Sequence, residues 1–294
     1  MRAGSESSIR RVLLALLRDR LPLFGITVVI VLVAVAILAP VIAPQNPYDL
    51  AQLNIMDGRL PPGSRGANGM LYLLGTDDQG RDLLSAILYG LRTSLLVGLS
   101  SAAIAVVIGT SLGLLGAYVG GWVDSLLMRI VDIQLSFPAI LIALILLAVL
   151  GQGVDKIILA LVVTQWAYYA RTVRGSALVV RRRTFIEAAR SMALPDRRIL
   201  FSHILPNCLA PLIVVVTMRV AYAIMLEATL SFLGIGLPIT KPSLGLLIAN
   251  GYEFMLSGDY WISFFPGLAL LLLIVAINLI GDSLRDILNP RQGE

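Results

Sequence analysis

Few side chains in this sequence could carry catalytic or metal chemistry. His203 is the one histidine and Cys208 the one cysteine, so the chain has neither an internal disulfide nor the several ligands of a zinc site. The two lysines, Lys156 and Lys241, are not followed by Ser or Thr, so the Gly-x-x-x-x-Gly-Lys-Ser/Thr loop that binds nucleotide phosphates is absent. We therefore expect no catalytic residue and no metal ligand in this chain.

Charge is instead concentrated in one ordered stretch, FIEAARSMALPDRRILFSHILP, which begins at Phe185. On a helix its first residues separate into two sides. The apolar side holds Phe185, Ala188, Ala189 and Met192. The polar side holds Glu187, Arg190 and Ser191. Pro195 and Asp196 suit the first turn of a second helix, which we expect Pro206 to close.

The apolar side of this short helix is shallow, because two of its four residues are alanines. A shallow face of this kind suits docking into a groove of another protein. The alternative is a helix that lies on the lipid surface. The residues alone leave both interpretations open.

The elements that hold this stretch must lie in a membrane. The chain has 294 residues, of which 57% are hydrophobic and 14% charged, and a soluble domain of that composition would have too little polar surface. A helix needs ~20 apolar residues to cross a bilayer, and the fourth candidate is long enough only if its flanking charges reach outward. The six candidate spans are 21–43, 93–123, 133–154, 157–170, 207–236 and 260–281. The first is too long for a cleaved signal peptide.

Positive charge sets the orientation of these six spans. With the N-terminus in the cytoplasm, sixteen lysines and arginines fall inside and six outside, as the positive-inside rule requires. The pI of 9.6 then reflects topology and contact with membrane lipid rather than nucleic-acid binding. We expect one all-α membrane domain with both termini cytoplasmic. Its parts are a cytoplasmic tail (1–20), a first transmembrane helix (21–43), an extracytoplasmic segment (44–92), a five-helix core (93–284) with a cytoplasmic loop (177–206), and a second tail (285–294).

Two further patterns concern helix packing. Residues 83–91 place leucine and isoleucine at helical spacing, so we expect an amphipathic helix on the outer membrane face that leads into the second span. Within that span, Gly109, Gly113, Ala117 and Gly121 stand four residues apart. Small residues on one face allow another membrane helix to approach closely, which predicts an interior position for this span.

The charged stretch resembles the EAA loop of ABC-type importers, in which Glu-Ala-Ala is followed by Gly and then by Ile-x-Leu-Pro. Glu187, Ala188 and Ala189 match the start of that pattern. Ala193 occupies the Gly position, which in the family serves a helix-ending turn with positive φ. An L-residue there costs roughly 1 kcal/mol, so we expect a turn of different shape in which Pro195 helps to stop the helix.

The resemblance covers most of the chain and points to the C-type permease subunit of dipeptide, oligopeptide and nickel importers. The similar segments are IAPQNPYDL from Ile42, LGTDDQGRDLLS from Leu74, YGLRTSLLVGL from Tyr89, GGWVDSLLMRIVD from Gly120, FPAILIA from Phe137, EATLSFLGIG from Glu227 and NLIGDSLRDILNP from Asn278. The chain lacks the histidine that family members often carry before LGTD, and Leu244 stands in PSLG where the family usually has Trp. Both differences lie on the predicted outer face.

The resemblance implies a type I ABC-importer permease fold in the bacterial inner membrane. It implies an ATPase-coupling helix with Phe185, Glu187, Ala188, Ala189, Arg190, Met192, Ala193 and Pro195 at the contact. The implied partners are a second homologous permease subunit in a heterodimer, two ATPase subunits that bind ATP and Mg²⁺, and an extracytoplasmic solute-binding protein. The chain itself would hold no cofactor. The implied cargo is a dipeptide or oligopeptide, or alternatively nickel or another small solute.

Arg219 and Glu227 both fall inside the fifth predicted span. They lie ~12 Å apart along a helix and point in different directions, so we do not expect a direct pair. Each costs ~2.5–3.5 kcal/mol on lipid and should face protein or a wet cavity. One interpretation places both on a translocation pathway that meets a zwitterionic peptide, and the other assigns them structural roles between helices.

Two other classes of membrane protein fit the sequence less well. A stand-alone secondary transporter needs repeated halves and carboxylates at the bilayer midplane, for which Glu227 alone is little support. An intramembrane hydrolase needs a Ser–His or paired-Asp arrangement inside the bilayer, whereas His203 falls in the loop region. Both classes leave the EAA stretch unexplained.

Overall fold

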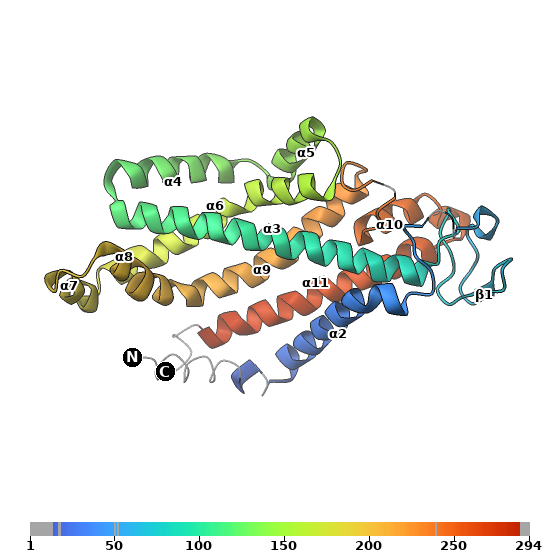
Figure 1. Ribbon diagram of the computed structural model, residues 1–294, viewed down its shortest axis with the longest axis horizontal. Helices are drawn as coiled ribbons and strands as arrows, with labels where there is room; N and C mark the ends of the chain where they lie inside the picture. Colours follow the sequence, from blue (N-terminus) through green and yellow to red (C-terminus); the bar gives the residue numbers. More distant parts are fainter. Residues whose placement is uncertain (1–13, 17–18, 50, 52, 239, 289–294) are drawn as a thin grey trace.

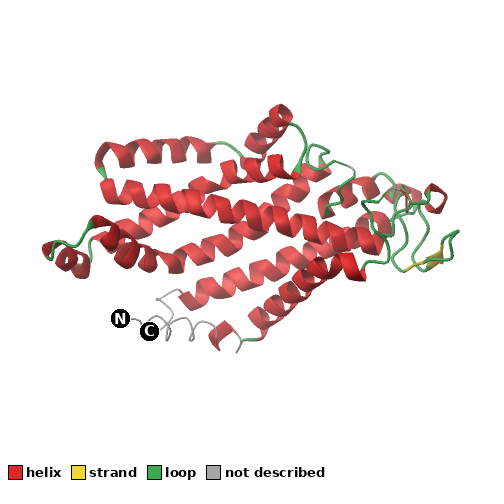
Figure 2. Ribbon diagram, in the orientation of Figure 1, coloured by secondary structure: helices red, strands yellow, loops and turns green. Residues whose placement is uncertain are grey.

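The computed structural model describes residues 14–16, 19–49, 51, 53–238 and 240–288. Long helices lie side by side and make up most of the molecule (Figures 1 and 2), which confirms the all-α prediction. In chain order the elements are α2 (Arg20–Ile42), η2 (Ile55–Asp57), β1 (Ser64–Arg65), β2 (Leu71–Tyr72), α3 (Leu83–Val119), α4 (Gly121–Ser136), α5 (Ala139–Leu150), α6 (Val154–Arg181), α7 (Thr184–Ser191), α8 (Asp196–Arg198), η3 (Ile199–Ile204), α9 (Leu205–Phe232), α10 (Leu244–Tyr252), η4 (Met255–Ser257) and α11 (Trp261–Leu288).

Within the described residues, four helices are long and apolar enough to cross a bilayer. They are α2, α3, the continuous helix Asp196–Phe232 and α11, and the pair α4 and α5 makes a fifth if it counts as one span. The remaining long helix, α6, has 28 residues but carries charged residues at both ends of its apolar stretch. The six-span count therefore stays a prediction, and α6 is the helix on which it depends.

The third predicted span, 133–154, is wrong as a single straight helix. α4 ends at Ser136, α5 begins at Ala139, and the two helices are bent by 89° relative to each other. Pro138 explains the break, because a proline pushes the residue before it out of helical geometry. Phe137 accordingly has extended backbone angles, with φ −94° and ψ 141°.

The amphipathic helix expected over residues 83–91 is wrong as a separate surface element. These residues are the first turns of α3, which continues without a break to Val119. Leu83, Ile87 and Leu91 are buried in one apolar cluster with residues of α2, α10 and α11, such as Trp261. Their apolar side therefore packs against protein and not against the lipid surface.

The small residues of α3 bring it close to α6, as their spacing predicted. A Cβ added to Gly113 would lie 3.1 Å from the Cα of Ala170, and one added to Gly109 would lie 2.9 Å from the nitrogen of Ala170. Backbone atoms at these distances leave no room for a larger side chain. The contact between α3 and α6 is the most extensive between any two helices of the described chain.

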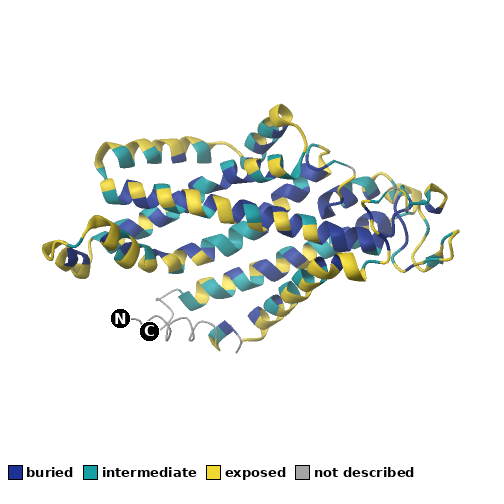
Figure 3. Cartoon of the chain, viewed as in Figure 1, coloured by how far each residue is buried: buried dark blue, intermediate teal, exposed yellow. Residues whose placement is uncertain are grey.

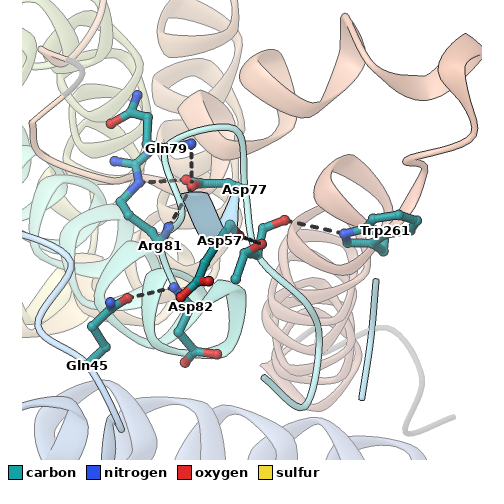
Figure 4. Close-up of polar contacts among 8 residues, drawn as sticks. Gln45, Asp57, Asp77, Gln79, Arg81, Asp82 and Trp261 are labelled. Carbon is teal, nitrogen blue, oxygen red and sulfur yellow. Dashed lines mark hydrogen bonds and ion pairs between the residues drawn. The ribbon is translucent and has the colours of Figure 1, made fainter. Parts of the chain in front are cut away.

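The segment between α2 and α3, residues 43–82, closes one end of the bundle and is called the cap below (Figure 1). It contains the antiparallel pair β1 and β2, in which Ser64 lies opposite Tyr72. Its centre is an almost fully buried ion pair, since Arg81 Nε donates to Asp77 Oδ2 at 2.5 Å. The other carboxylate oxygen of Asp77 accepts from the backbone N–H groups of Gln79 and Arg81 at 2.9 Å (Figure 4).

Side-chain hydrogen bonds fasten the cap to the helices around it (Figure 4). Gln45 Oε1 accepts from the N–H of Asp82 at 2.7 Å, which joins the chain after α2 to the start of α3. Trp261 Nε1 donates to the carbonyl of Thr76 at 3.3 Å, which joins the cap to α11. Burial is dense where the cap, α3 and α10 meet, whereas the outward faces of the long helices are exposed (Figure 3).

Candidate functional site

The charged stretch lies at the end of the molecule opposite the cap. There α7 projects beyond the long helices (Figure 1). The chain leaves α6 in a tight turn, in which the N–H of Arg183 donates to the carbonyl of Val180 at 3.0 Å. This turn places α7 outside the bundle, where most of its side chains are accessible.

α7 has a buried inward side and an exposed outward side, and the outward side combines residues of the predicted apolar and polar sides. Ile186 and Ala189 are buried, at 0% and 5% exposure, in a cluster that also contains Ile199. The outward side consists of exposed residues, namely Phe185, Glu187, Ala188, Arg190 and Met192. The placement of Ala189 on the docking face is therefore wrong, because this alanine packs against the chain itself.

The turn that ends α7 contains a strained residue. Ala193 has φ +52°, in the left-handed region. Its N–H donates to the carbonyl of Arg190 at 2.8 Å, and the N–H of Leu194 donates to the carbonyl of Ala189 at 3.2 Å, which is a Schellman motif. The expectation that alanine would change the shape of this turn is wrong. The alanine instead adopts the positive φ, and Pro195 caps the next helix at φ −62°.

The sequence predicted that the helix after this turn ends at Pro206, and this prediction is wrong. α8, η3 and α9 form one helix from Asp196 to Phe232. The segment η3, which contains the half-buried His203, is π-helical. Pro206 is the second residue of α9, after Leu205, and the wider π-helical turn that precedes it accommodates a residue that lacks an N–H and would crowd an ordinary preceding turn. The charged stretch is therefore continuous with the long helix α9.

Polar contacts fix this end of the bundle around α7. Arg174 donates through Nε and Nη2 to the two carboxylate oxygens of Asp124 at 2.6 Å each, which joins α6 to α4. The hydroxyl of Tyr118 donates to the carboxylate of Asp196, which joins the end of α3 to the start of α8. The helices that flank α7 are thus held to the rest of the bundle.

A groove of about 560 Å³ lies beside α7, at the junction of α6, α7 and α9. Its lining residues are Ser176, Val179, Val180, Arg183, Thr184, Phe185, Asn207 and Pro211. Phe185 belongs both to this groove and to the outward side of α7. A partner element that contacts α7 would therefore also meet the first turns of α9.

Glu227 is fully buried inside the bundle. Its Oε2 accepts from the hydroxyl of Ser94 on α3 at 2.9 Å, and its Oε1 accepts from the hydroxyl of Ser231 at 2.8 Å. The contact with Ser94 joins α3 to α9. Ser94 was not identified from the sequence, and nothing in the local pattern around it signals a partner 133 residues away.

Arg219 occupies a different environment on the same helix. Its guanidinium carbon lies 3.2 Å from the ring centre of Tyr168 on α6 and 5.2 Å from that of Tyr222. Within the described residues it has no carboxylate within 4.0 Å. The prediction that Arg219 and Glu227 do not pair is confirmed, and the two residues do not share a site.

Two family models match this sequence. The model described as binding-protein-dependent transport system inner membrane component matches residues 105–294. The model described as N-terminal TM domain of oligopeptide transport permease C matches residues 7–62. Together they cover both the first helix and the helical core.

Curated relatives match almost the whole chain. A putative peptide transport system permease protein of Brucella abortus is 42% identical over 94% of this chain and 90% of its own length. The dipeptide transport system permease protein DppC of Haemophilus influenzae is 37% identical over 93% and 92%. The glutathione transport system permease protein GsiD of Pectobacterium atrosepticum is 39% identical over 90% and 84%.

Among solved structures, a chain of the MetNI methionine ABC transporter in an inward-facing conformation has a similar fold. The TM-score is 0.57, and the match covers 70% of this chain and 97% of that chain. Sequence identity is 22%, so this similarity bears on the fold alone.

Proposed function

The chain belongs to the family of binding-protein-dependent transport system inner membrane components, and we propose that it is the permease subunit of an ATP-driven importer of dipeptides or oligopeptides. Its place among ABC-importer permeases and its fold class are confirmed. The observation that carries the proposed cargo is the series of peptide-transport relatives that match nine tenths or more of the chain.

We propose that α7 is the contact through which a separate ATPase subunit acts on this chain. Phe185, Ala188 and Met192 form an exposed apolar strip, and Met192 is 73% exposed. Glu187, next to this strip, is available for a basic residue of the partner. Because the chain continues from α7 into the helix that contains α9, a displacement of α7 would be passed on to a membrane-spanning element.

The energy source in this proposal lies outside the chain. Its sequence has no P-loop, so ATP and Mg²⁺ would bind to two partner ATPase subunits. A second homologous permease subunit would complete the translocation pathway as a heterodimer. An extracytoplasmic solute-binding protein would deliver cargo to the end of the molecule that carries the cap.

The arrangement of the helices supports cytoplasmic termini. The first residue of α2 and the last of α11 lie at the end of the bundle that carries α7, away from the cap (Figure 1). An ATPase acts in the cytoplasm, so the proposed role of α7 places this end inside. The excess of arginine around α7 agrees with that orientation.

Co-purification from the native host tests the coupling proposal. A tagged chain would be purified in mild detergent as the natural sequence and as Glu187→Arg, and its partners identified by mass spectrometry. A matched control is Glu253→Arg, which reverses an exposed charge at the opposite end of the molecule. We expect a P-loop ATPase with the natural chain and the control, and much less of it with Glu187→Arg.

Two results would contradict the coupling role of α7. One is an ATPase retained equally by Glu187→Arg and by the natural chain. The other is a natural chain that retains a second permease subunit but brings no ATPase. Uptake of a radiolabelled peptide by proteoliposomes of the purified complex, with ATP enclosed, then tests the cargo separately.

A further inference from the structure

Arg219 lies in the middle of a membrane-spanning helix without a partner of opposite charge. It follows Leu205 by 14 residues and precedes Phe232 by 13 within α9, so it is ~20 Å from either end. A cation at this depth is costly on lipid and is retained where it faces protein, water or a ligand. Among the described residues, neither an ion pair nor a hydrogen bond to Arg219 is found within contact distance.

Two aromatic rings hold this guanidinium in place and leave its donors available. Tyr168 lies under it at 3.2 Å and Tyr222 beside it at 5.2 Å. Rings attract the cation through their faces but accept none of the five N–H groups in the way a carboxylate does. The side chain is half-buried, so part of it remains open at the surface of this chain. Its planar fork suits a carboxylate bound through two parallel hydrogen bonds.

The adjacent face of α6 carries buried polar atoms that also lack partners. Both polar atoms of the Gln165 side chain and the hydroxyl of Tyr169 are buried without a hydrogen bond within the described chain. Gln165 precedes Tyr168 by three residues and Tyr169 by four, so all three side chains lie on neighbouring positions of one helix. Buried amides and hydroxyls are normally satisfied by protein or ordered water. This part of the bundle is therefore suited to water and polar ligands rather than to lipid.

We propose that Arg219, held by Tyr168 and Tyr222, binds a carboxylate group, and that this carboxylate is the C-terminus of the transported peptide. The inference rests on the proposed peptide-import function. It adds a recognition site within the membrane-spanning part of the chain. An acidic side chain of the second permease subunit presents the same chemistry, and the experiment separates the two sources.

The experiment uses the complete complex in proteoliposomes, with the solute-binding protein outside at saturating concentration and ATP inside. Uptake of trialanine is compared with uptake of its C-terminal amide, which lacks the carboxylate. The variants are Arg219→Gln, which removes the charge, and Arg219→Lys, which keeps the charge but not the fork. Arg171→Gln is the control. It removes an exposed guanidinium of α6 that lies three residues after Tyr168 and pairs with Asp132.

We expect the natural complex and Arg171→Gln to take up trialanine faster than the amide. Arg219→Gln should assemble and hydrolyse ATP, yet lose trialanine uptake by about tenfold or more, since it removes a charge-assisted pair of hydrogen bonds. Its ratio of acid to amide uptake should fall towards one. Arg219→Lys should give an intermediate ratio.

Three outcomes would overturn the inference. An unchanged acid-to-amide ratio in Arg219→Gln, with the natural complex active, refutes carboxylate recognition and leaves the proposed function intact. Loss of the second permease subunit from Arg219→Gln assigns the carboxylate to that subunit. A natural complex that imports neither peptide removes the proposed peptide function and the inference with it.

Discussion

Replacing Ala193 by glycine should stabilise the turn that ends α7. At φ +52° an alanine costs about 1–2 kcal/mol, and glycine removes that cost because it has no Cβ. Glycine also gives the unfolded chain more freedom, which acts in the opposite direction by about 0.4–1 kcal/mol. The centres of these ranges leave a net stabilisation of about 0.8 kcal/mol. Ala193→Val should destabilise the turn, because a β-branched residue fits positive φ worse than alanine.

Hydrogen exchange at the N–H of Leu194 is the suitable assay. This N–H donates to the carbonyl of Ala189 at 3.2 Å and becomes free only when the turn opens. A change of about 0.8 kcal/mol corresponds to roughly fourfold slower exchange in Ala193→Gly. The three sequences at position 193 should rank Gly slowest, then Ala, then Val.

A matched substitution separates backbone strain from a general effect of glycine. Ala188 is exposed within α7 and has ordinary helical geometry, so Ala188→Gly should destabilise the helix by about 0.5–1 kcal/mol. The two glycine substitutions should therefore have opposite signs. Faster exchange in Ala193→Gly, or the same sign at both positions, would refute the strain argument.

Further predictions concern the cap and the bundle. Burial raises the pKa of Asp78 above its ordinary 3.8, and the charge of the neighbouring Asp77 raises it further. The contribution of Asp78 to folding stability is therefore present at acidic pH and is lost as pH rises through the raised pKa. Asp78→Asn should therefore stabilise the protein at pH 7 and flatten the pH dependence of Tm above pH 4; a steeper dependence contradicts this. Gly113→Ala should lower Tm, because a Cβ at this position meets the backbone of α6. Gly175→Ala should raise Tm slightly, because the space around Gly175 is open and alanine favours the helix. Equal effects of the two substitutions on Tm would contradict the close approach of α3 to α6. Glu227→Ala should cost about 2–4 kcal/mol and Glu227→Gln less, since alanine leaves a cavity and two unpaired serine hydroxyls; equal thermal shifts would exclude a structural role for these bonds.

The sequence by itself determined the membrane class, the family and the place of the charged stretch. Hydropathy and arginine asymmetry depend on composition over ~20 residues, so both can be evaluated from the sequence without knowledge of tertiary contacts. The charged stretch that begins at Phe185 located α7, which begins at Thr184, because signals that favour or stop a helix act locally. The spacing of Gly109 and Gly113 likewise predicted a close helix contact, although not its partner.

Only the tertiary structure decided how the local signals were used. Residues 83–91 have the pattern of a surface helix, but contacts with α2, α10 and α11 bury them. Ala193 prefers another conformation, and the two hydrogen bonds of the turn hold it at positive φ. Arg219 and Glu227 are both charged residues within one predicted span, yet Arg219 is held by two tyrosines and Glu227 accepts hydrogen bonds from two serines. These outcomes depend on residues far away in the chain, which no local pattern contains.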